Sequence, residues 1–472
     1  MYNPENQYRC TIIRGKAQTE LDDLLITYAS IVNEVTPTDR ETFNNLFNDK
    51  LSVHFYKMGF DNLTEDKRKT IRNHITEISE KLFALSYTDE QGIVFSSESC
   101  QKILEDNDQP AFFKNLCFNF QQPNGTQKIQ TVEEKISAGI KSRPLHLVLA
   151  VLRIAQKQGL EITKSDLAFY LLNSLDALQG CVRPIEIIQR ILEDRTALIT
   201  REFDWGSSRD SQHIREQLNL LSLANLIHVD GQIVKINLLE LKLIDSFVDM
   251  CNTPIEIDPD KYNLSEPDQR KKFYSDWNQY NGSINIEKPD YLTTTVESLG
   301  FWNSTLSVGK STPATSVQSS SLKEIGDEGE FIVLEFEKTR VGSFNPRLTN
   351  KVIHVGGTKG LGYDILSVEA DELISDPEFA RYIEVKTTKR STVPDFSSAN
   401  WYDTVNLTKR EWIVARQFGP AFNIYRVYLT PSGNKIIKLG NPHNKSLVNE
   451  IIVEPVMYRL DFENKAIDLH YK

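Results

Sequence analysis

The sequence contains few of the features that mark secreted, zinc-binding or membrane proteins. Its five cysteines are odd in number, widely spaced and never form a C-x-x-C pair, which argues against a disulfide framework and a zinc ribbon. The eight histidines form no H-x-x-x-H pair, so no zinc site is expected. No stretch approaches the roughly 20 apolar residues of a membrane span, and the N-terminus lacks the basic start and apolar core of a secretory signal. We therefore expect a cytoplasmic protein with no membrane contact.

The sequence also lacks an excess of positive charge. Its formal net charge is −11, which disfavours nucleic acid as a partner, because Lys and Arg supply much of the affinity for phosphates. A groove can still be basic on an acidic protein, so a DNA hypothesis depends on where the cations lie. The 40% apolar and 25% charged residues are ordinary for globular material, and 472 residues suggest several domains of about 150 residues each.

One stretch marks a clear domain boundary. Residues 303–321 are rich in Ser and Thr with almost no large apolar residues, so they cannot bury enough surface to stay folded and are typical of a linker. We predict a C-terminal domain at 321–472, preceded by a connector and linker at 251–320. The N-terminal part is expected to hold a mixed α+β unit at 1–135, itself a candidate DNA-binding domain, and a second unit at 136–250.

The first unit contains a predicted amphipathic helix over residues 64–82. Its polar face carries Lys67, Arg68, Lys69 and Arg72. These cations indicate either a solvated helix face or a contact with phosphates, and the sequence leaves both readings open.

The second unit has the element order of a winged helix. Three helical stretches are followed by a helix that begins near Ser211, and then by strand-like runs at 226–229 and 232–236 joined by an Asp-Gly pair. A winged helix commonly lays its last helix in the major groove, although such units also mediate protein contacts. The candidate readers of bases and phosphates on this helix are Gln212, His213, Arg215 and Gln217.

Two acids and a lysine in the C-terminal domain are candidate residues of an active site. The alternation of a strand places Glu384 and Lys386 on one face and Val385 on the other, and Asp364 lies near the start of the preceding predicted strand. Two carboxylates from adjacent strands can share Mg²⁺. A lysine beside them can orient or deprotonate the attacking water and offset charge that builds on a phosphate. The predicted order of helix, three strands, helix and strand is a compact α/β core.

The run "GYDI" followed by "IEVKTT" resembles the PD-(D/E)xK nuclease motif. The longer set "GDEGE", "GYDI", "IEVKTT", "LTKREWIVA" and "YRVY", over roughly residues 321–430, resembles the C-terminal domain of the NO VEIN family. The resemblance implies an α/β nuclease core with a mixed sheet flanked by helices. The residue patterns described above place mainly α-helical domains before it, including the winged-helix-like unit.

The same resemblance implies roles for individual residues. Asp364 and Glu384 would hold Mg²⁺, Lys386 would be the catalytic lysine, and Glu330 would be a further catalytic acid from the first helix. Glu411 matches a Glu of the family and is an accessory candidate. The sequence departs from the motif in one respect, since a tyrosine replaces the proline before the first acid, which removes no ligand.

Cations near these acids supply the local positive charge that DNA requires. The predicted DNA contacts here are Lys389, Arg390, Lys409 and Arg410, with Arg340, Arg347, Lys351 and Lys359 across the preceding loop.

Together these features predict a Mg²⁺-dependent DNA endonuclease of a restriction system, specific for a sequence or a modification, whose layout resembles modular restriction endonucleases. The expected partners are double-stranded DNA, a second copy of the chain in a stable or transient dimer, because one such domain cuts one strand at a time, and a companion DNA methyltransferase. The alternatives are a catalytically inactive DNA-binding or assembly module and a nuclease of repair or RNA processing.

Overall fold

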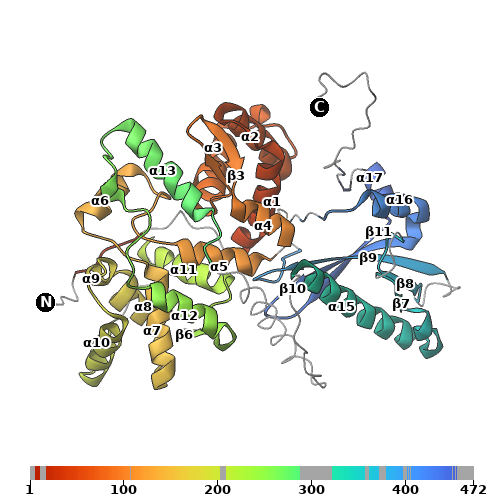
Figure 1. Ribbon diagram of the computed structural model, residues 1–472. Helices are drawn as coiled ribbons and strands as arrows, with labels where there is room; N and C mark the ends of the chain where they lie inside the picture. The colour runs from red at the N-terminus through yellow and green to blue at the C-terminus, as the bar shows by residue number, and fades with distance from the viewer. Residues whose placement is uncertain are drawn as a thin grey trace, which may run out of the picture. The chain divides into compact units, whose positions relative to one another are not determined.

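The chain divides into two compact units in the computed structural model (Figure 1). Unit 1 comprises Met1–Asp327, Thr387–Val405 and Val427–Lys435. Unit 2 comprises Glu328–Lys386, Asn406–Arg426 and Ile436–Lys472. The structure describes residues 6–10, 18–106, 108–201, 209–286, 321–356, 361–370, 379–396, 401, 403, 405–448, 450, 451 and 453. The predicted linker at 303–321 lies outside these residues except for its last position.

Unit 1 is built mainly from helices. Its α-helices are α1 (Gln18–Val35), α2 (Arg40–Tyr56), α3 (Glu65–Asn73), α4 (Glu98–Asp106), α5 (Gln109–Asn119), α6 (Ile129–Ser137), α7 (Pro144–Gln158), α8 (Lys164–Leu167), α9 (Leu175–Leu178), α10 (Pro184–Thr196), α11 (Arg209–Leu223), α12 (Leu241–Met250) and α13 (Pro267–Asn281). Two π-helical segments, η2 (His74–Leu82) and η3 (Ala168–Leu172), continue α3 and α8. Short 3₁₀ turns occur at Phe60–Asn62, Leu238–Glu240 and Pro259–Lys261.

Two small sheets complete unit 1. Strands β1 (Thr38–Asp39), β3 (Ile93–Ser96) and β2 (Ser86–Thr88) pair in that order, as do β4 (Ile162–Thr163), β6 (Ile233–Ile236) and β5 (Ile227–Asp230). The predicted hairpin after α11 is confirmed, since β5 and β6 are antiparallel with Val229 opposite Val234. Gly231 in the turn has φ +57°, a conformation that glycine adopts without steric cost.

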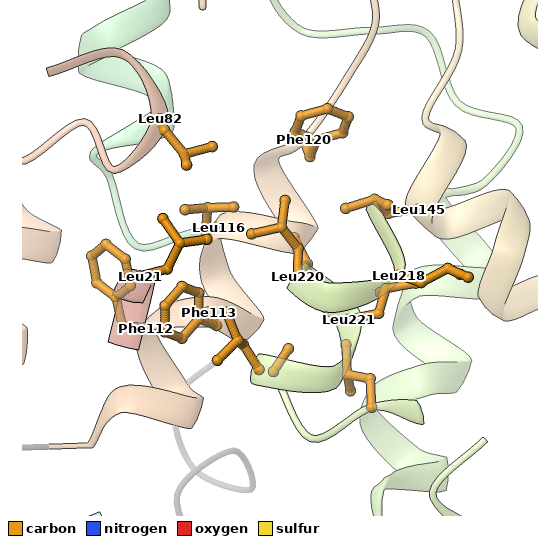
Figure 2. Close-up of a cluster of buried hydrophobic side chains, with 14 of the residues drawn as sticks. Leu21, Leu82, Phe112, Phe113, Leu116, Phe120, Leu145, Leu218, Leu220 and Leu221 are labelled. Carbon is orange, nitrogen blue, oxygen red and sulfur yellow. The ribbon is translucent and has the colours of Figure 1, made fainter. Parts of the chain in front are cut away.

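The core of unit 1 extends across the predicted boundary at residue 135. Figure 2 shows side chains of α5, including Phe113 and Leu116, in one cluster with Leu218 and Leu221 of α11. Leu21 of α1 and Leu82 of η2 belong to the same cluster. Apolar periodicity predicted a buried face for α11 and for the helix that ends at Leu82, but it did not predict that these faces share one core with α1 and α5.

The predicted amphipathic helix at 64–82 is present as α3 and η2, and its apolar stripe is buried. The basic face is mostly on the outside: Lys67, Lys69 and Arg72 are exposed and Arg68 is half-buried. Arg72 pairs with Glu65, the first residue of α3. Among the described residues, no helix is long and apolar enough to cross a membrane.

The C-terminal part of the chain forms a five-stranded sheet in the order β11-β10-β9-β8-β7. Its elements are α15 (Ser321–Phe344), a 3₁₀ turn (Pro346–Lys351), β7 (Ile353–His354), β8 (Ile365–Val368), β9 (Ala380–Lys389), α16 (Lys409–Phe418), a 3₁₀ turn (Gly419–Ala421), β10 (Phe422–Leu429), β11 (Lys435–Gly440) and α17 (Pro442–Leu447). The predicted order of helix, three strands, helix and strand is confirmed. β11 and α17 were not predicted.

A buried ionic network holds α15 on the sheet, along which it lies in Figure 1. The fully buried Glu337 carboxylate accepts hydrogen bonds from Ser367 on β8 (2.6 Å), from the Tyr425 hydroxyl on β10 (2.8 Å) and from Arg340 (2.7 and 2.9 Å). Burial alone would raise the pKa of Glu337, but the Arg340 and Ser367 hydrogen bonds hold it below its ordinary value. Arg340 also donates to two backbone carbonyls, so its guanidinium is engaged here and the prediction that it contacts DNA is not supported.

Helix α16 packs on the other face of the sheet. The Phe418 ring stacks on Tyr382 of β9 with centroids 4.0 Å apart, while the neighbouring Arg381 points toward α15, as strand alternation requires. Tyr363, the residue in place of the motif proline, packs edge-on against Tyr382 at 5.0 Å. The predicted flanking of the sheet by helices is therefore present.

Candidate active site

The first acid is fixed by the backbone of the neighbouring strand. β8 and β9 are antiparallel with Ile365 opposite Ile383, and continuing this register by one residue places Asp364 opposite Glu384. The Asp364 N–H donates to the Ile383 carbonyl (2.9 Å), and the Val385 N–H donates to Asp364 Oδ2 (2.8 Å). The carboxylate of Asp364 is thus held at the start of β8, beside the strand that carries the other acid.

The second acid and the lysine meet on one face of β9. Lys386 Nζ lies 2.8 Å from Glu384 Oε1 and 3.1 Å from Glu411 Oε2. Glu384 is 3% exposed, so its charge is largely removed from water. The predicted placement of Glu384 and Lys386 on the same face is confirmed.

The accessory candidate Glu411 joins Lys386 to the start of α16. The Glu411 N–H donates to Thr408 Oγ1 (3.2 Å), and Glu411 Oε2 accepts the Thr408 N–H (2.8 Å), which together form a capping box. The same oxygen accepts a hydrogen bond from Lys386. The sequence pattern T-x-x-E at residues 408–411 is the signal of this capping box.

The helix acid Glu330 reaches the same end of the sheet. His354 Nε2, on β7, lies 2.5 Å from Glu330 Oε2. A Cβ atom on Gly356 would lie 2.5 Å from Glu330 Oε2, 3.1 Å from His354 Nε2 and 3.3 Å from Asp364 Oδ1. These three atoms therefore surround one glycine, and Glu330 stands close to Asp364. No sequence signal pointed to His354.

Burial and neighbouring negative charges raise the pKa values of Asp364 and Glu384. Burial raises the pKa of Asp364 to about 6, with the negative charges of Glu330 and Glu411 adding to the effect and Lys386 opposing it. Burial likewise raises the pKa of Glu384 to about 8, where Lys386 opposes and Asp364 adds. Four acids around one lysine leave an excess of negative charge at this end of unit 2.

The donor set fits a hard divalent cation of the magnesium type. In the part of the chain that the structure describes, no three or more His, Cys, Asp and Glu side chains stand as a ready-made metal cluster. Mg²⁺ does not need one, because it binds through one or two carboxylates and keeps several waters. Asp364 and Glu384, on directly opposed strand positions, offer two carboxylates of this kind.

The candidate DNA-reading residues of α11 differ in exposure. Arg215 is exposed, while Gln212 and His213 are half-buried, with His213 Nδ1 3.7 Å from Glu216. Gln217 is 1% exposed, so its side chain cannot reach a base in this structure, and that prediction is not supported. The reason is helical geometry, since Gln217 lies three residues after the buried Ile214 and shares its inward face.

The cations after the lysine are also buried. Within unit 1, Lys389 Nζ lies 3.6 Å from Asp108 Oδ2, and both side chains are fully buried. Arg390 is 4% exposed and its guanidinium lies 5.9 Å from the centroid of the Tyr428 ring. The prediction that Lys389 and Arg390 contact phosphates is therefore not supported, because both side chains are enclosed by protein.

Other predicted cations do reach the surface. Arg347 and Arg410 are exposed, and Lys351 is half-buried. Lys359 and the side chain of Lys409 lie outside the described residues.

These observations define a class of protein in which a helical unit accompanies an α/β unit that brings an Asp, a Glu and a Lys together at one end of its sheet. The family described as "Restriction endonuclease BpuJI - N terminal" matches residues 2–278, and the chain belongs to this family. A second family, "Protein NO VEIN, C-terminal", matches residues 329–439, which confirms the resemblance expected for the C-terminal domain.

Among solved structures, the chain is similar to a crystal structure described as pyrene- and phenanthrene-modified DNA in complex with the BpuJ1 endonuclease binding domain. The sequences are 43% identical, the match covers 60% of this chain and 100% of that chain, and the TM-score is 0.55. The comparison with curated proteins returned no match.

Proposed function

We propose that the protein is a Mg²⁺-dependent DNA endonuclease of the restriction type, in which unit 1 binds DNA and the site of unit 2 hydrolyses it. The observation that carries this proposal is the convergence of Asp364, Glu384 and Lys386 at one end of the sheet. Their arrangement supports assignment to the PD-(D/E)xK class, whose motif these residues resemble.

DNA binding is supported by the relative of unit 1. That relative is described as a binding domain in complex with DNA, and it matches this chain over its full length. The order of α11 followed by the β5–β6 hairpin, with β4 completing the sheet, supports a winged helix that presents Gln212, His213 and Arg215 to the major groove. The exposed cations of α3 add a candidate phosphate contact.

Each residue of the site has a distinct proposed part in hydrolysis. Asp364 and Glu384 would hold Mg²⁺, which when bound supplies a Lewis acid for the scissile phosphate and the attacking water. Glu411 fixes the direction of the Lys386 side chain through the hydrogen bond to Nζ. Lys386 has three N–H donors, of which two are directed at Glu384 and Glu411, so one remains to donate to the attacking water or to the phosphate oxygen on which charge develops.

The charges around Lys386 favour this role over that of a base. Burial lowers the pKa of Lys386, but Glu384 and Glu411 outweigh that effect and the net shift is upward. The amine is therefore protonated near neutral pH. A protonated lysine stabilises negative charge and orients the water, whereas it cannot accept a proton.

Cutting both strands would require a second copy of the chain on the DNA, because one site hydrolyses one phosphodiester bond at a time. Restriction also requires that host DNA be spared. A companion methyltransferase, or recognition of a modification that the host lacks, would provide this.

The proposal is tested by incubating purified protein with DNA of mixed sequence and modification, in Mg²⁺ and in EDTA. We expect discrete cuts in Mg²⁺ that disappear with Asp364→Ala and Glu384→Gln. Glu335→Ala is the matched control, since Glu335 lies on α15 and pairs with Lys338, away from the site. Binding without cutting in every condition would support an inactive DNA-binding module, and cutting of RNA alone would support RNA processing.

A further inference from the structure

We propose that His354 is a positioning residue that holds the Glu330 carboxylate beside Asp364 during hydrolysis. This inference rests on the proposed function of unit 2, and it assigns a part to a residue outside the Asp-Glu-Lys set.

The contact between the two side chains is direct. Glu330 lies on α15 and His354 on β7, which is paired to β8 through Ile353 opposite Leu366. The Glu330 carboxylate can only accept, so the 2.5 Å contact is a hydrogen bond from the Nε2–H of His354. This bond links a helix to the edge strand of the sheet.

A glycine makes the arrangement possible. The Gly356 backbone passes so close to Glu330 Oε2 that a Cβ atom would stand 2.5 Å away, well inside van der Waals contact. The same position would be 3.3 Å from Asp364 Oδ1. A side chain at Gly356 would therefore push the end of the Glu330 side chain away from the position it holds beside His354 and Asp364.

The hydrogen bond from His354 fixes the direction of the Glu330 side chain. The Glu330 side chain is 20% exposed and the His354 side chain 44%, so burial alone does not select a rotamer for either. A histidine that orients a carboxylate at the edge of a metal site commonly changes metal affinity or activity about 10- to 100-fold when it is removed. Held close to Asp364, the Glu330 carboxylate would add negative charge and a hydrogen-bond acceptor beside the cation that Asp364 would hold.

Three variants test this role. His354→Ala removes the donor, His354→Gln restores an N–H close to the position of Nε2, and Gly356→Ala closes the space for Glu330. Ile353→Thr is the matched control, since Ile353 is the exposed neighbour on the same strand. The measurements are calorimetric titration with Ca²⁺ or Mn²⁺, the Mg²⁺ concentration for half-maximal cutting, and the melting temperature without metal.

We expect His354→Ala and Gly356→Ala to weaken metal binding about tenfold and to raise the Mg²⁺ requirement by a similar factor, with His354→Gln returning most of the loss. Ile353→Thr should match the wild type. The inference is overturned if His354→Ala binds metal as tightly as the wild type. It is also overturned if His354→Gln and Ile353→Thr lose as much metal affinity as His354→Ala and all three melt at a lower temperature, because that result indicates a structural role. A wild-type protein that neither binds the cation nor cuts overturns the proposed function instead.

Discussion

Lys114 of unit 1 and Lys386 of unit 2 both pair with acids, but Lys114 is fully buried and Lys386 is half-buried, and the two differ in how their charge is balanced. In unit 1, Lys114 Nζ lies 2.6 Å from Glu240 Oε1 with both side chains fully buried, so each of these charges has an opposite charge beside it. In unit 2, Lys386 contacts two carboxylates, with Asp364 and Glu330 close behind them. A buried ion pair balances its own charge, whereas a surplus of acids that are buried or half-buried, as at Glu384 and Asp364, is costly unless a further cation balances it. The Lys114 contact has the character of a structural ion pair, and the surplus of acids around Lys386 supports the proposal that a cation binds there.

The largest expected effect comes from removing the lysine of unit 2. Lys386→Ala should lower the rate of DNA cutting about 10²- to 10³-fold, because the developing charge on the phosphate loses its donor. Single-turnover cutting of labelled DNA measures this. Unchanged DNA affinity in a gel-shift assay would show that the loss lies in the chemistry, and a rate within a factor of a few of the wild type would break the comparison.

The same substitution in unit 1 should act on folding. Lys114→Ala leaves Glu240 buried without its cation and should lower the free energy of unfolding by about 3 to 5 kcal/mol. Urea denaturation followed by far-UV circular dichroism, dominated by the helices of unit 1, measures the change. The double variant Lys114→Met with Glu240→Leu should recover much of it. If Lys114→Ala is neutral, the pair is not the matched structural contact described here.

Lowering the pH should have a smaller effect, again on the stability of unit 1. Burial lowers the pKa of His146 from 6.5 to about 4, while hydrogen bonds to the Phe118 and Phe247 carbonyls oppose the shift. The unfolded chain therefore binds this proton first, and stability is lost as pH falls from 6.5 toward 4. The loss from this group at pH 5 relative to pH 7 is about 2 kcal/mol. Urea denaturation at both pH values should show a shallower dependence for His146→Gln than for the wild type.

The smallest effect concerns two residues of α11. Arg215→Ala should weaken DNA binding roughly fivefold and lower the slope of log affinity against log salt by about one, because an exposed arginine contacts phosphate. Gln217→Leu, at the buried position, should leave both unchanged. Fluorescence anisotropy over a range of salt concentrations measures the pair. Equal losses for both variants would mean that exposure in this structure does not identify the DNA-facing side of α11.

Local patterns predicted the convergence of Asp364, Glu384 and Lys386 more successfully than they predicted which polar side chains are exposed. Strand alternation was enough to place Glu384 and Lys386 together, because a period of two depends only on the strand itself. The exposure of Lys389 depends instead on Asp108, which is more than 250 residues away in the sequence, and no local pattern contains that information. Gln217 was an avoidable error, since its spacing from Ile214 already indicated the inward face.

In the fold, too, local features were predicted from the sequence and contacts between distant segments were not. The order of elements in the C-terminal domain and the hairpin after α11 followed from apolar periodicity and turn residues. The shared core of unit 1 did not, because periodicity identifies which face of a helix is buried but not its partner. The contact between His354 and Glu330 was beyond sequence reasoning for the same reason: a lone histidine at a strand end has no pattern.

The central claim is that Asp364 and its neighbours hydrolyse DNA with an activated water, and cutting in ¹⁸O-labelled water tests it most directly. The wild-type protein in Mg²⁺ should release fragments that carry one ¹⁸O atom on each new terminal phosphate, and Asp364→Ala should release none. Labelled fragments in equal amounts from both proteins, or an intact substrate with the wild type across DNA of every modification state, would contradict the account.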